Sequence, residues 1–297
     1  MKTQKFDPQS LEVKRLSSAL GAEIRGVKLA ILDTEGASAI ENLLIEHKVL
    51  LFPDQALSVD EHVAFGSLFG DLEGHPHYEN PITEHDKIFE LVASRGGVAD
   101  EWHSDITFRP NPALISILNM VKCPEIGGDT LWANPELALE KLSTPLRDLC
   151  QGLTALHNAA PHGHPDDMTI HPVVRTHPVT GKKTLFVNEH FTRRIVELSH
   201  SESESLLGYL TQWIATPSFT MRYHWAAGTI AMWDNRCTQH KVLNDFDEER
   251  VVQRVTVMGD TPKGIPPKWE PFVRPGHDSD KSRYDQLLLK HLNRRRS

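Results

Sequence analysis

The chain has 297 residues, a formal net charge of −8, 24% charged residues and 39% hydrophobic residues. This composition is ordinary for a globular protein with a sizeable core, and the acidic balance argues against general nucleic-acid binding. The apolar runs are too short to span a bilayer, and the N-terminal residues lack the apolar stretch of a secretory signal. We therefore expect partners that are neither membranes nor nucleic acids.

The cysteines are too few and too scattered for a disulfide framework. Cys123, Cys150 and Cys237 are an odd number, and none of them belongs to a CxxC pair. Reduced thiols are typical of a cytoplasmic protein, so we expect a cytoplasmic location.

The first third of the chain predicts a mixture of helix and strand. Two short strands over 13–16 and 22–27 are expected to be joined by a turn, and a buried strand is expected over 49–52. Helices are expected after Asp33 or Thr34 and after Ser58, because these residue types are good N-caps and Glu61 gives Ser58 the spacing of a capping box.

After Gly74 the pattern changes to many short apolar stretches separated by turn residues. Such a series predicts a β-sandwich or barrel. Strands are expected over 88–92, 113–121, 130–133, 184–188, 220–225, 229–233 and 250–258. Helices are expected over 135–142, continuing towards 149, and over 201–214. Residues 158–169 are rich in His, Pro, Gly and Asp and are expected to form a mobile loop.

The C-terminal end differs from the rest, being rich in proline after residue 260 and helical over about 282–292. We interpret the whole chain, 1–297, as a single domain. Its core would span about 10–262, with an appendage over about 263–297.

An imidazole and a carboxylate stand two residues apart in the stretch Trp-His-Ser-Asp. On a strand, residues i and i+2 point to the same face, so His103 and Asp105 could bind one metal ion. His240 supplies a third candidate ligand 137 residues later (240 − 103). Two nitrogens and one carboxylate oxygen on one face are typical of non-haem Fe(II) oxygenases. Alone, the HxD spacing also fits a surface histidine beside a capping aspartate.

Two arginines, Arg250 and Arg254, are spaced i and i+4 on a predicted strand and share one face. An inward-facing guanidinium must be paired, and a small dicarboxylate and an anionic substrate would each provide a bidentate partner. The alternative is a solvated face on which the arginines pair with Glu248 or Glu249.

A Gly-Gly-Asp-Thr sequence over 127–130 predicts a tight turn before a strand. Thr130 could offer its hydroxyl to a carboxylate. The alternative is an ordinary hairpin turn with no role in binding.

Together these motifs resemble the taurine dioxygenase-like (TauD/TfdA) family of Fe(II)- and 2-oxoglutarate-dependent dioxygenases. The likeness runs from about residue 16 to residue 261 and looks closest to the taurine branch. It is carried by the segments 102–108, 127–134, 171–178, 185–189, 191–192, 233–240 and 250–254. The resemblance implies a mainly β fold with flanking helices (α+β), a clavaminate synthase-like double-stranded β-helix, or jelly roll.

The resemblance also implies roles for matching residues. His103, Asp105 and His240 would bind Fe(II), and the far carboxylate of 2-oxoglutarate would lie on Thr130 and Arg250. The residues implied in substrate binding are His75, Tyr78, Ile106, Phe191 and Arg254. As alternatives, His75 and Tyr78 could only close a loop, and Phe191 could belong to the core.

The implied reaction is an O2-dependent hydroxylation of a small anionic substrate, coupled to decarboxylation of 2-oxoglutarate. An organosulfonate such as taurine is the first choice, with release of succinate, CO2, an aldehyde and sulfite. Alkyl sulfates and aryloxy or other carboxylates are alternatives, and a non-catalytic metal-binding jelly-roll protein is an alternative of another class.

Three departures from the taurine branch leave the identity of the substrate open. Ala99 stands where taurine-specific members carry an amide, the segment 157–170 is shorter than their lid, and the tail is longer. The resemblance further suggests a homo-oligomer, either a dimer or a tetramer.

Overall fold

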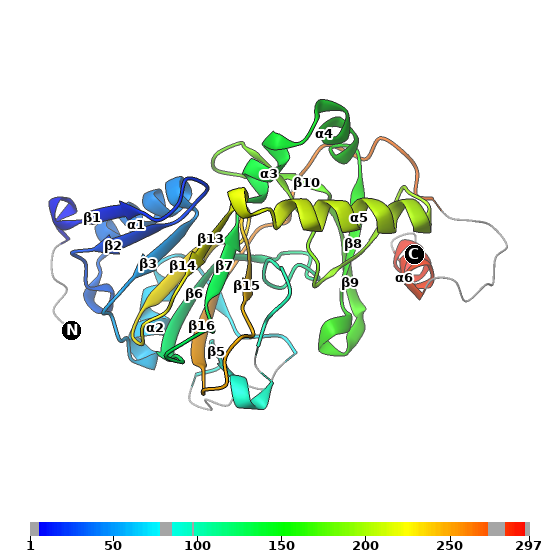
Figure 1. Ribbon diagram of the computed structural model, residues 1–297. Coiled ribbons are helices and arrows are strands. Elements are labelled where there is room, and N and C mark those ends of the chain that lie inside the picture. Colours follow the sequence, from blue (N-terminus) through cyan, green and yellow to red (C-terminus); the bar gives the residue numbers. More distant parts are fainter. Residues whose placement is uncertain (1–5, 78–84, 97, 273–282, 295–297) are drawn as a thin grey trace.

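The computed structural model describes residues 6–77, 85–96, 98–272 and 283–294. Two sheets that face each other form the centre of the fold, as in a jelly roll (Figure 1). The large sheet has the strand order β1-β2-β3-β14-β6-β16-β4, with β5 also paired to β16, and the small sheet has the order β13-β7-β15. The N-terminal elements lie at one end of the molecule and the last helix at the other.

The strands of the two facing sheets agree closely with the predicted ones. The large sheet consists of β1 (Glu12–Arg15), β2 (Ala22–Arg25), β3 (Val49–Phe52), β4 (Leu72–Glu73), β5 (Ile88–Val92), β6 (Ala113–Lys122), β14 (Ile230–Asp234) and β16 (Val251–Met258). The small sheet consists of β7 (Thr130–Ala133), β13 (Thr220–Tyr223) and β15 (Gln239–Val242). β4 and β15 were not predicted.

Both faces of the large sheet are buried, because successive side chains of a strand point to opposite sides. In β14, Ile230 and Met232 pack towards α1 (Thr34–His47) and α2 (Val59–Ser67). Trp233 belongs instead to the core between the sheets, where its ring lies 5.9 Å from that of Trp132. Burial on both faces explains why β3 reads Val-Leu-Leu-Phe, without a polar residue.

The predicted N-caps of the first two helices are confirmed. The carboxylate of Asp33 accepts a hydrogen bond from the backbone N–H of Gly36 at 2.8 Å. The Ser58 hydroxyl accepts from Glu61 N at 3.3 Å, and the Glu61 carboxylate accepts from Ser58 N at 2.9 Å. These contacts satisfy N–H groups that the first helical turn leaves without partners.

The helical stretch expected from 135 towards 149 is interrupted. α3 (Pro135–Lys141) ends at an extended Leu142, and α4 (Thr144–Cys150) begins after Ser143. Pro145 lies in the first turn of α4, where the missing proline N–H costs no hydrogen bond. The next long helix, α5 (His200–Ile214), lies where a helix was predicted.

The expectation of a mobile loop over 158–169 is wrong. Instead, strands β8 (Thr154–Ala159) and β9 (His164–Pro172) form an antiparallel hairpin. The short 3-10 helix η4 (Ala160–His162) connects them. β12 (Thr192–Ile195) pairs with β8, so the hairpin and β12 together form a third, three-stranded sheet. β10 (Val174–Thr176) and β11 (Lys183–Leu185) form a separate two-stranded sheet. Strand β9 escapes prediction because its exposed first half is polar and its sequence does not alternate.

The predicted C-terminal helix is α6 (Arg283–Arg294), and it packs on the third sheet. Leu288 is buried against Leu156 of β8 and Val196. Nζ of Lys290 contacts Asp166 of β9 at 2.8 Å. The helix therefore braces the outer side of the β8–β9 hairpin (Figure 1).

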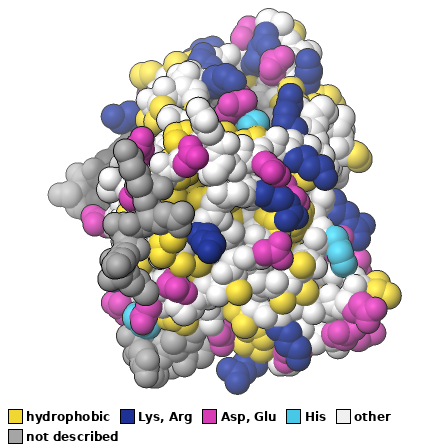
Figure 2. Space-filling view, turned by 90° about the vertical axis from the view of Figure 1, so that its left-hand side faces the viewer, with side chains coloured by type: hydrophobic (Ala, Val, Ile, Leu, Met, Phe, Trp, Pro, Cys, Tyr) yellow, Lys and Arg dark blue, Asp and Glu magenta, His cyan; other side chains and the backbone are white. Residues whose placement is uncertain are grey.

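The surface shown in Figure 2 carries basic and acidic side chains interspersed with hydrophobic ones. Such mixing produces no large field of a single sign on this face. Within the part of the chain that the structure describes, no helix has the length and apolar character needed to cross a membrane.

Candidate active site

His103, Asp105 and His240 lie together as a buried cluster. Each offers a ligand atom within 4.8 Å of the others, and the residues are 6%, 3% and 5% exposed. His103 and His240 also pair through their backbones: His103 N donates to His240 O at 3.1 Å, and His240 N donates to His103 O at 2.8 Å. His240 lies on β15, whereas His103 forms an isolated bridge with it and Asp105 begins a turn.

The cluster has the protonation states that a metal ion requires. Nδ1 of His103 donates to the carbonyl of Glu101 at 2.8 Å, which leaves the lone pair of Nε2 facing Oδ1 of Asp105 at 3.8 Å. Burial lowers the pKa of His103 well below its usual value and that of His240 to about 4. Burial acts to raise the pKa of Asp105, but the charge of Arg254 and the hydrogen bond from Ser116 act in the opposite direction, and the pKa is lowered.

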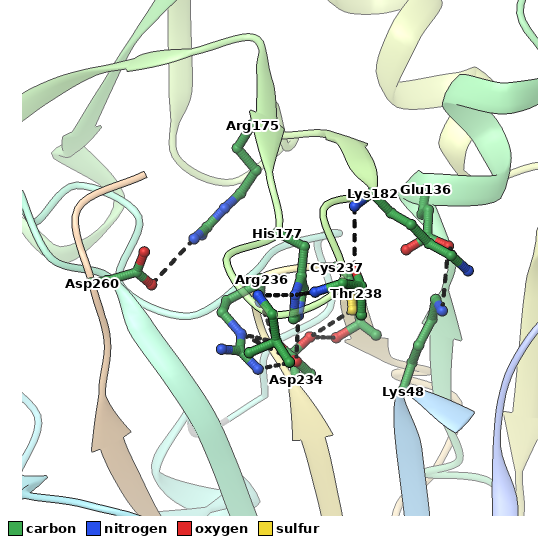
Figure 3. Close-up of polar contacts among 12 residues, drawn as sticks. Lys48, Glu136, Arg175, His177, Lys182, Asp234, Arg236, Cys237, Thr238 and Asp260 are labelled. Atoms are coloured by element: carbon green, nitrogen blue, oxygen red, sulfur yellow. Dashed lines mark hydrogen bonds and ion pairs between the residues drawn. The ribbon is translucent and has the colours of Figure 1, made fainter. Parts of the chain in front are cut away.

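The turn between β14 and β15 is held by a buried ion pair (Figure 3). Asp234, which is 0% exposed, accepts from Arg236 Nε at 2.9 Å and from Arg236 Nη2 at 2.6 Å. Nδ1 of His177 accepts from the backbone N–H groups of Val179 and Thr180 at 3.2 Å, so the ring proton lies on Nε2 and donates to Asp234 at 3.0 Å. Both carboxylate oxygens are therefore occupied.

A second group, His177, Asp234 and Cys237, is also compact enough to hold a metal ion. The side chain of Arg236 already neutralises the carboxylate. Burial and the neighbouring Asp234 raise the pKa of the Cys237 thiol well above its usual value, whereas a thiol ligand must be deprotonated. We interpret this group as a structural clamp on the turn that leads to His240.

A buried cation lies beside the predicted turn over 127–130. Nε of Arg250 donates to the carbonyl of Gly128 at 3.1 Å, and its Nη2 lies 3.5 Å from the hydroxyl of Thr130. The indole N–H of Trp225 donates to the same hydroxyl oxygen at 2.9 Å. A Cβ on Gly128, whose φ is 65°, would lie 3.3 Å from the Arg250 side chain, which explains the glycine.

Arg250 forms no ion pair with any carboxylate of the described residues, although Asp129 lies near enough to act on its pKa. Among the residues that the structure describes, no carboxylate lies within 4.0 Å of its guanidinium, and the residue is 3% exposed. Burial lowers its pKa to about 10. A buried charge without a counter-ion is costly, so this pocket is suited to binding an anion.

A cavity of about 460 Å³ adjoins the cluster of His103 and Asp105, which are among its lining residues. Its size is that of a small-molecule site. The other polar or charged lining residues include His75, Glu90, Arg95, His162, His190 and Arg254. The apolar ones include Phe89, Leu91, Val92, Val98, Ala99, Ile106 and Phe191.

Arg254 and His75 present hydrogen-bond donors to this cavity. Nη1 of Arg254 donates to Oδ1 of Asp105, and its buried Nε has no hydrogen-bond partner among the described residues. Burial, with a contribution from Arg254, lowers the pKa of His75 to about 2, so the ring is neutral. Its Nδ1 accepts from His77 N at 3.2 Å, which leaves the proton on Nε2. A guanidinium beside a neutral N–H donor can bind an anionic head group.

The backbone at Ile106 is strained. Its φ is 48°, in the left-handed region that β-branched residues rarely adopt. Neighbouring contacts hold the segment in place: Asp105 N donates to Oδ1 of Asn235 at 3.0 Å, and Nε2 of His171 donates to the carbonyl of Thr107 at 2.9 Å. Strain of this kind costs about 1–3 kcal/mol and persists where the surroundings determine the conformation.

The structure gathers the described residues that the sequence singled out into two groups. The cavity is lined by His103, Asp105, Ile106, Phe191, His75 and Arg254, and His240 completes the cluster beside it. The second group is the pair of Thr130 and Arg250. Tyr78 lies outside the described residues. Phe191 also packs on Phe108, at 5.2 Å between ring centroids, so it is a core residue as well as a lining residue.

Sequence reasoning missed several residues of the site. His162 comes from the unpredicted β8–β9 hairpin, and His190 pairs with Glu101 at 2.6 Å. Ser116 and Asn235 bind the Asp105 carboxylate and backbone, respectively. Of these residues, only Asn235 could have been singled out from the sequence, because it lies inside the segment 233–240 that carries the family resemblance.

Comparison with known sequences identifies relatives over most of the chain. The model of the taurine catabolism dioxygenase TauD, TfdA family matches residues 12–256. The chain is 39% identical over 280 residues to an alkylsulfatase of Acinetobacter baylyi, which covers 86% of this chain and 87% of that protein. It is 36% identical over 279 residues to an alpha-ketoglutarate-dependent sulfate ester dioxygenase of Pseudomonas putida, which covers 86% and 92%.

Solved structures share the fold. A taurine dioxygenase from Burkholderia xenovorans superposes with a TM-score of 0.78 and 37% identity, covering 88% of this chain and 95% of that chain. AAD-2, in complex with Mn(II) and N-oxalylglycine, superposes with a TM-score of 0.75 and 26% identity, covering 85% and 98%. The jelly roll predicted from the sequence is therefore confirmed. This chain belongs to the taurine catabolism dioxygenase TauD, TfdA family.

Proposed function

We propose that this chain is an Fe(II)- and 2-oxoglutarate-dependent dioxygenase that hydroxylates the carbon beside the anionic head group of a small organosulfur compound. The observation that carries the proposal is the combination of the His103–Asp105–His240 cluster with two buried arginines, Arg250 just before β16 and Arg254 within it. Arg254 reaches the cavity beside Asp105, and Arg250 has no carboxylate partner among the described residues.

The donor set fits Fe(II). His103 and His240 offer neutral imidazoles and Asp105 offers a carboxylate, the combination found in facial triads. Nδ1 of His240 is buried without a hydrogen-bond partner among the described residues. When bound, iron and 2-oxoglutarate supply the oxidation, by which one oxygen atom of O2 enters a substrate C–H bond while 2-oxoglutarate becomes succinate and CO2.

The residues of the chain hold and orient the two organic molecules. Arg250 and Thr130 bind the far carboxylate of 2-oxoglutarate, and the indole of Trp225 keeps the Thr130 hydroxyl oxygen as an acceptor so that its proton is available to donate. Arg254 and His75 bind the head group of the substrate. If the hydroxylated carbon carries a sulfonate or a sulfate ester, the product collapses to an aldehyde and releases sulfite or sulfate.

The rest of the cavity favours a substrate with an apolar tail. Val92, Val98 and Phe191 line it, and its acidic lining residues among those described are Asp105 and Glu90. Glu90 already accepts a hydrogen bond from Nε2 of Gln253 at 3.0 Å. The ammonium group of taurine would have to pair with Glu90 here, whereas an alkyl sulfonate would need no anionic partner.

An alkyl sulfate is the second candidate substrate. The same apolar lining suits its tail, and its sulfo group presents the same oxygens to Arg254. The relative from Acinetobacter baylyi, named an alkylsulfatase, supports this candidate.

The proposal includes the setting of the enzyme. Residues from about 10 to 262 form one catalytic domain with an appendage after it, and α6 belongs to that appendage. We place the enzyme in the cytoplasm as a homo-oligomer, with a small molecule as its binding partner. The free thiols of Cys123, Cys150 and Cys237 support the cytoplasmic location.

The test combines a spectroscopic assay with a substrate panel. Anaerobic addition of Fe(II) and 2-oxoglutarate should produce a visible charge-transfer band, and addition of O2 with substrate should produce succinate. The panel contains taurine, an alkyl sulfonate, an alkyl sulfate and an aryloxy acid, with sulfite and sulfate measured separately. Absence of both the band and succinate with every member would contradict the proposal and leave the non-catalytic alternative.

A further inference from the structure

A serine outside the predicted ligand set contacts the carboxylate of Asp105. Ser116, on β6, donates from Oγ to Oδ2 of Asp105 at 2.6 Å. We propose that Ser116 and Asn235 are positioning residues that hold the Asp105 carboxylate so that only its Oδ1 is offered to the metal ion. This inference rests on the proposed function, because it concerns the same metal site.

The direction of each hydrogen bond in this network follows from the donors and acceptors present. Oδ1 of Asn235 lies 3.0 Å from Asp105 N and 3.2 Å from the indole N of Trp233, and both of these groups can only donate. The other end of the Asn235 side chain is therefore its NH2 group, which donates to Ser116 Oγ at 2.8 Å. Since Ser116 accepts there, its own proton is free to donate to the carboxylate.

The two carboxylate oxygens of Asp105 therefore have different partners. Oδ2 receives the proton of Ser116, whereas Oδ1 faces Nε2 of His103 and the guanidinium of Arg254. A facial triad leaves positions open for the co-substrate and oxygen. A carboxylate that bound the metal ion through both oxygens would occupy one of these open coordination positions. The hydrogen bond from Ser116 to Oδ2 therefore keeps the positions open.

The network has no exposed member and little freedom to move. Ser116 is 0% exposed and Asn235 is 2% exposed. Ser116 lies in the middle of β6, between Trp233 of β14 and Thr256 of β16 in the register of the large sheet. The backbone N–H of Asn235 is also fixed, because it donates to the carbonyl of Leu114 at 2.9 Å. Outer partners of this kind commonly change metal affinity about 10–100-fold when they are removed.

The experiment measures Mn(II) binding to the full-length chain by electron paramagnetic resonance, without turnover. Ser116→Ala should weaken Mn(II) binding about 10–100-fold and shift the anaerobic charge-transfer band of the Fe(II)–2-oxoglutarate form. Ser116→Thr keeps the hydroxyl and should restore most of the affinity. Ser116→Cys keeps nearly the volume but offers only a weak donor, so it should lie between the threonine and alanine variants.

A matched control separates positioning from a general effect on stability. Ser203 of α5 is another buried serine, 1% exposed, whose hydroxyl accepts from Ile195 N at 2.7 Å away from the cavity. Ser203→Ala should leave Mn(II) affinity and the band unchanged. Equal Mn(II) affinity in the Ser116→Ala, Ser116→Cys and unsubstituted chains would overturn the role of Ser116 but leave the proposed function standing. Absence of Mn(II) binding in the unsubstituted chain would overturn the proposed function as well.

Discussion

Nη1 of Arg254 donates to Oδ1 of Asp105, the same oxygen that faces Nε2 of His103. The residue proposed to bind the head group of the substrate is therefore in contact with a proposed ligand of the metal. Such a contact would keep the carbon next to the head group close to the reacting centre. It also means that replacing Arg254 removes the cation nearest to a buried carboxylate, so its variants need a control for metal binding.

Arg254→Gln should raise the KM for the organosulfur substrate at least tenfold, because truncating a buried charged partner typically costs 2 kcal/mol or more. The KM for 2-oxoglutarate should change by less than about twofold. Succinate formation at varied concentrations of each compound measures both constants. Mn(II) affinity and the midpoint of thermal unfolding serve as controls for the loss of the cation beside Asp105.

Arg250→Gln should show the opposite pattern, with a large rise in the KM for 2-oxoglutarate and little change for the substrate. The physical reason is that Arg250 is the buried cation beside Thr130 and lacks a carboxylate among the described residues. Equal effects of the Arg250 and Arg254 variants on 2-oxoglutarate would show that the two arginines have been assigned wrongly.

His240→Ala and Asp105→Ala should each abolish the anaerobic charge-transfer band, because two remaining ligands hold Fe(II) weakly. His62→Gln is a suitable control, since His62 is also buried but donates to the carbonyl of Ile117 at 3.0 Å in the core. An unchanged band in the His240 and Asp105 variants would mean that the metal binds elsewhere.

Asp234→Asn should destabilise the protein by about 3–5 kcal/mol, because it leaves Arg236 buried without its counter-ion. The urea unfolding curve measures this change. Glu23→Gln removes the partner of the half-exposed Arg25 and should leave the curve nearly unchanged. If both variants unfold at the same urea concentration, Asp234 does not clamp the turn.

The buried His62 should make stability depend on pH. Burial lowers its pKa in the folded protein from 6.5 to about 4, so between these values the unfolded chain binds more protons. Stability should therefore fall as the pH falls through this window, by about 3 kcal/mol in total for this group. His62→Gln lacks this titration, and the difference between its urea stability and that of the unsubstituted chain should shrink or reverse between pH 7 and pH 4. A constant difference would contradict the assignment.

Elements with strong local signals were predicted almost to the residue. The strands over 49–52, 88–92 and 130–133 agree with β3, β5 and β7, because their apolar runs end at clear turn residues. The β8–β9 hairpin was missed, since the first half of β9 is polar and the partner of its apolar residues is α6, far along the chain. Local sequence cannot reveal a partner of that kind.

In the candidate site too, residues with a local sequence signal were singled out, whereas those that depend on distant partners were missed. The sequence singled out His103, Asp105, His240, Arg250 and Arg254 as candidates, because metal and anion chemistry restricts which residue types can serve. Ser116 was not found, because a serine inside the apolar strand β6 carries no local signal. Its significance arises only from Asp105 and Asn235, which stand 11 and 119 residues away in the chain.

The backbone pairing of His103 with His240 joins two points that are 137 residues apart (240 − 103). The peptide groups of the two proposed iron-binding histidines are hydrogen-bonded to each other, so they meet only when β15 has joined the small sheet. On the proposed ligand assignment, a nascent chain whose synthesis has not reached residue 240 lacks one of the three iron ligands. On the same assignment, the complete iron site forms only together with the small sheet, so metal binding would report that this sheet has closed.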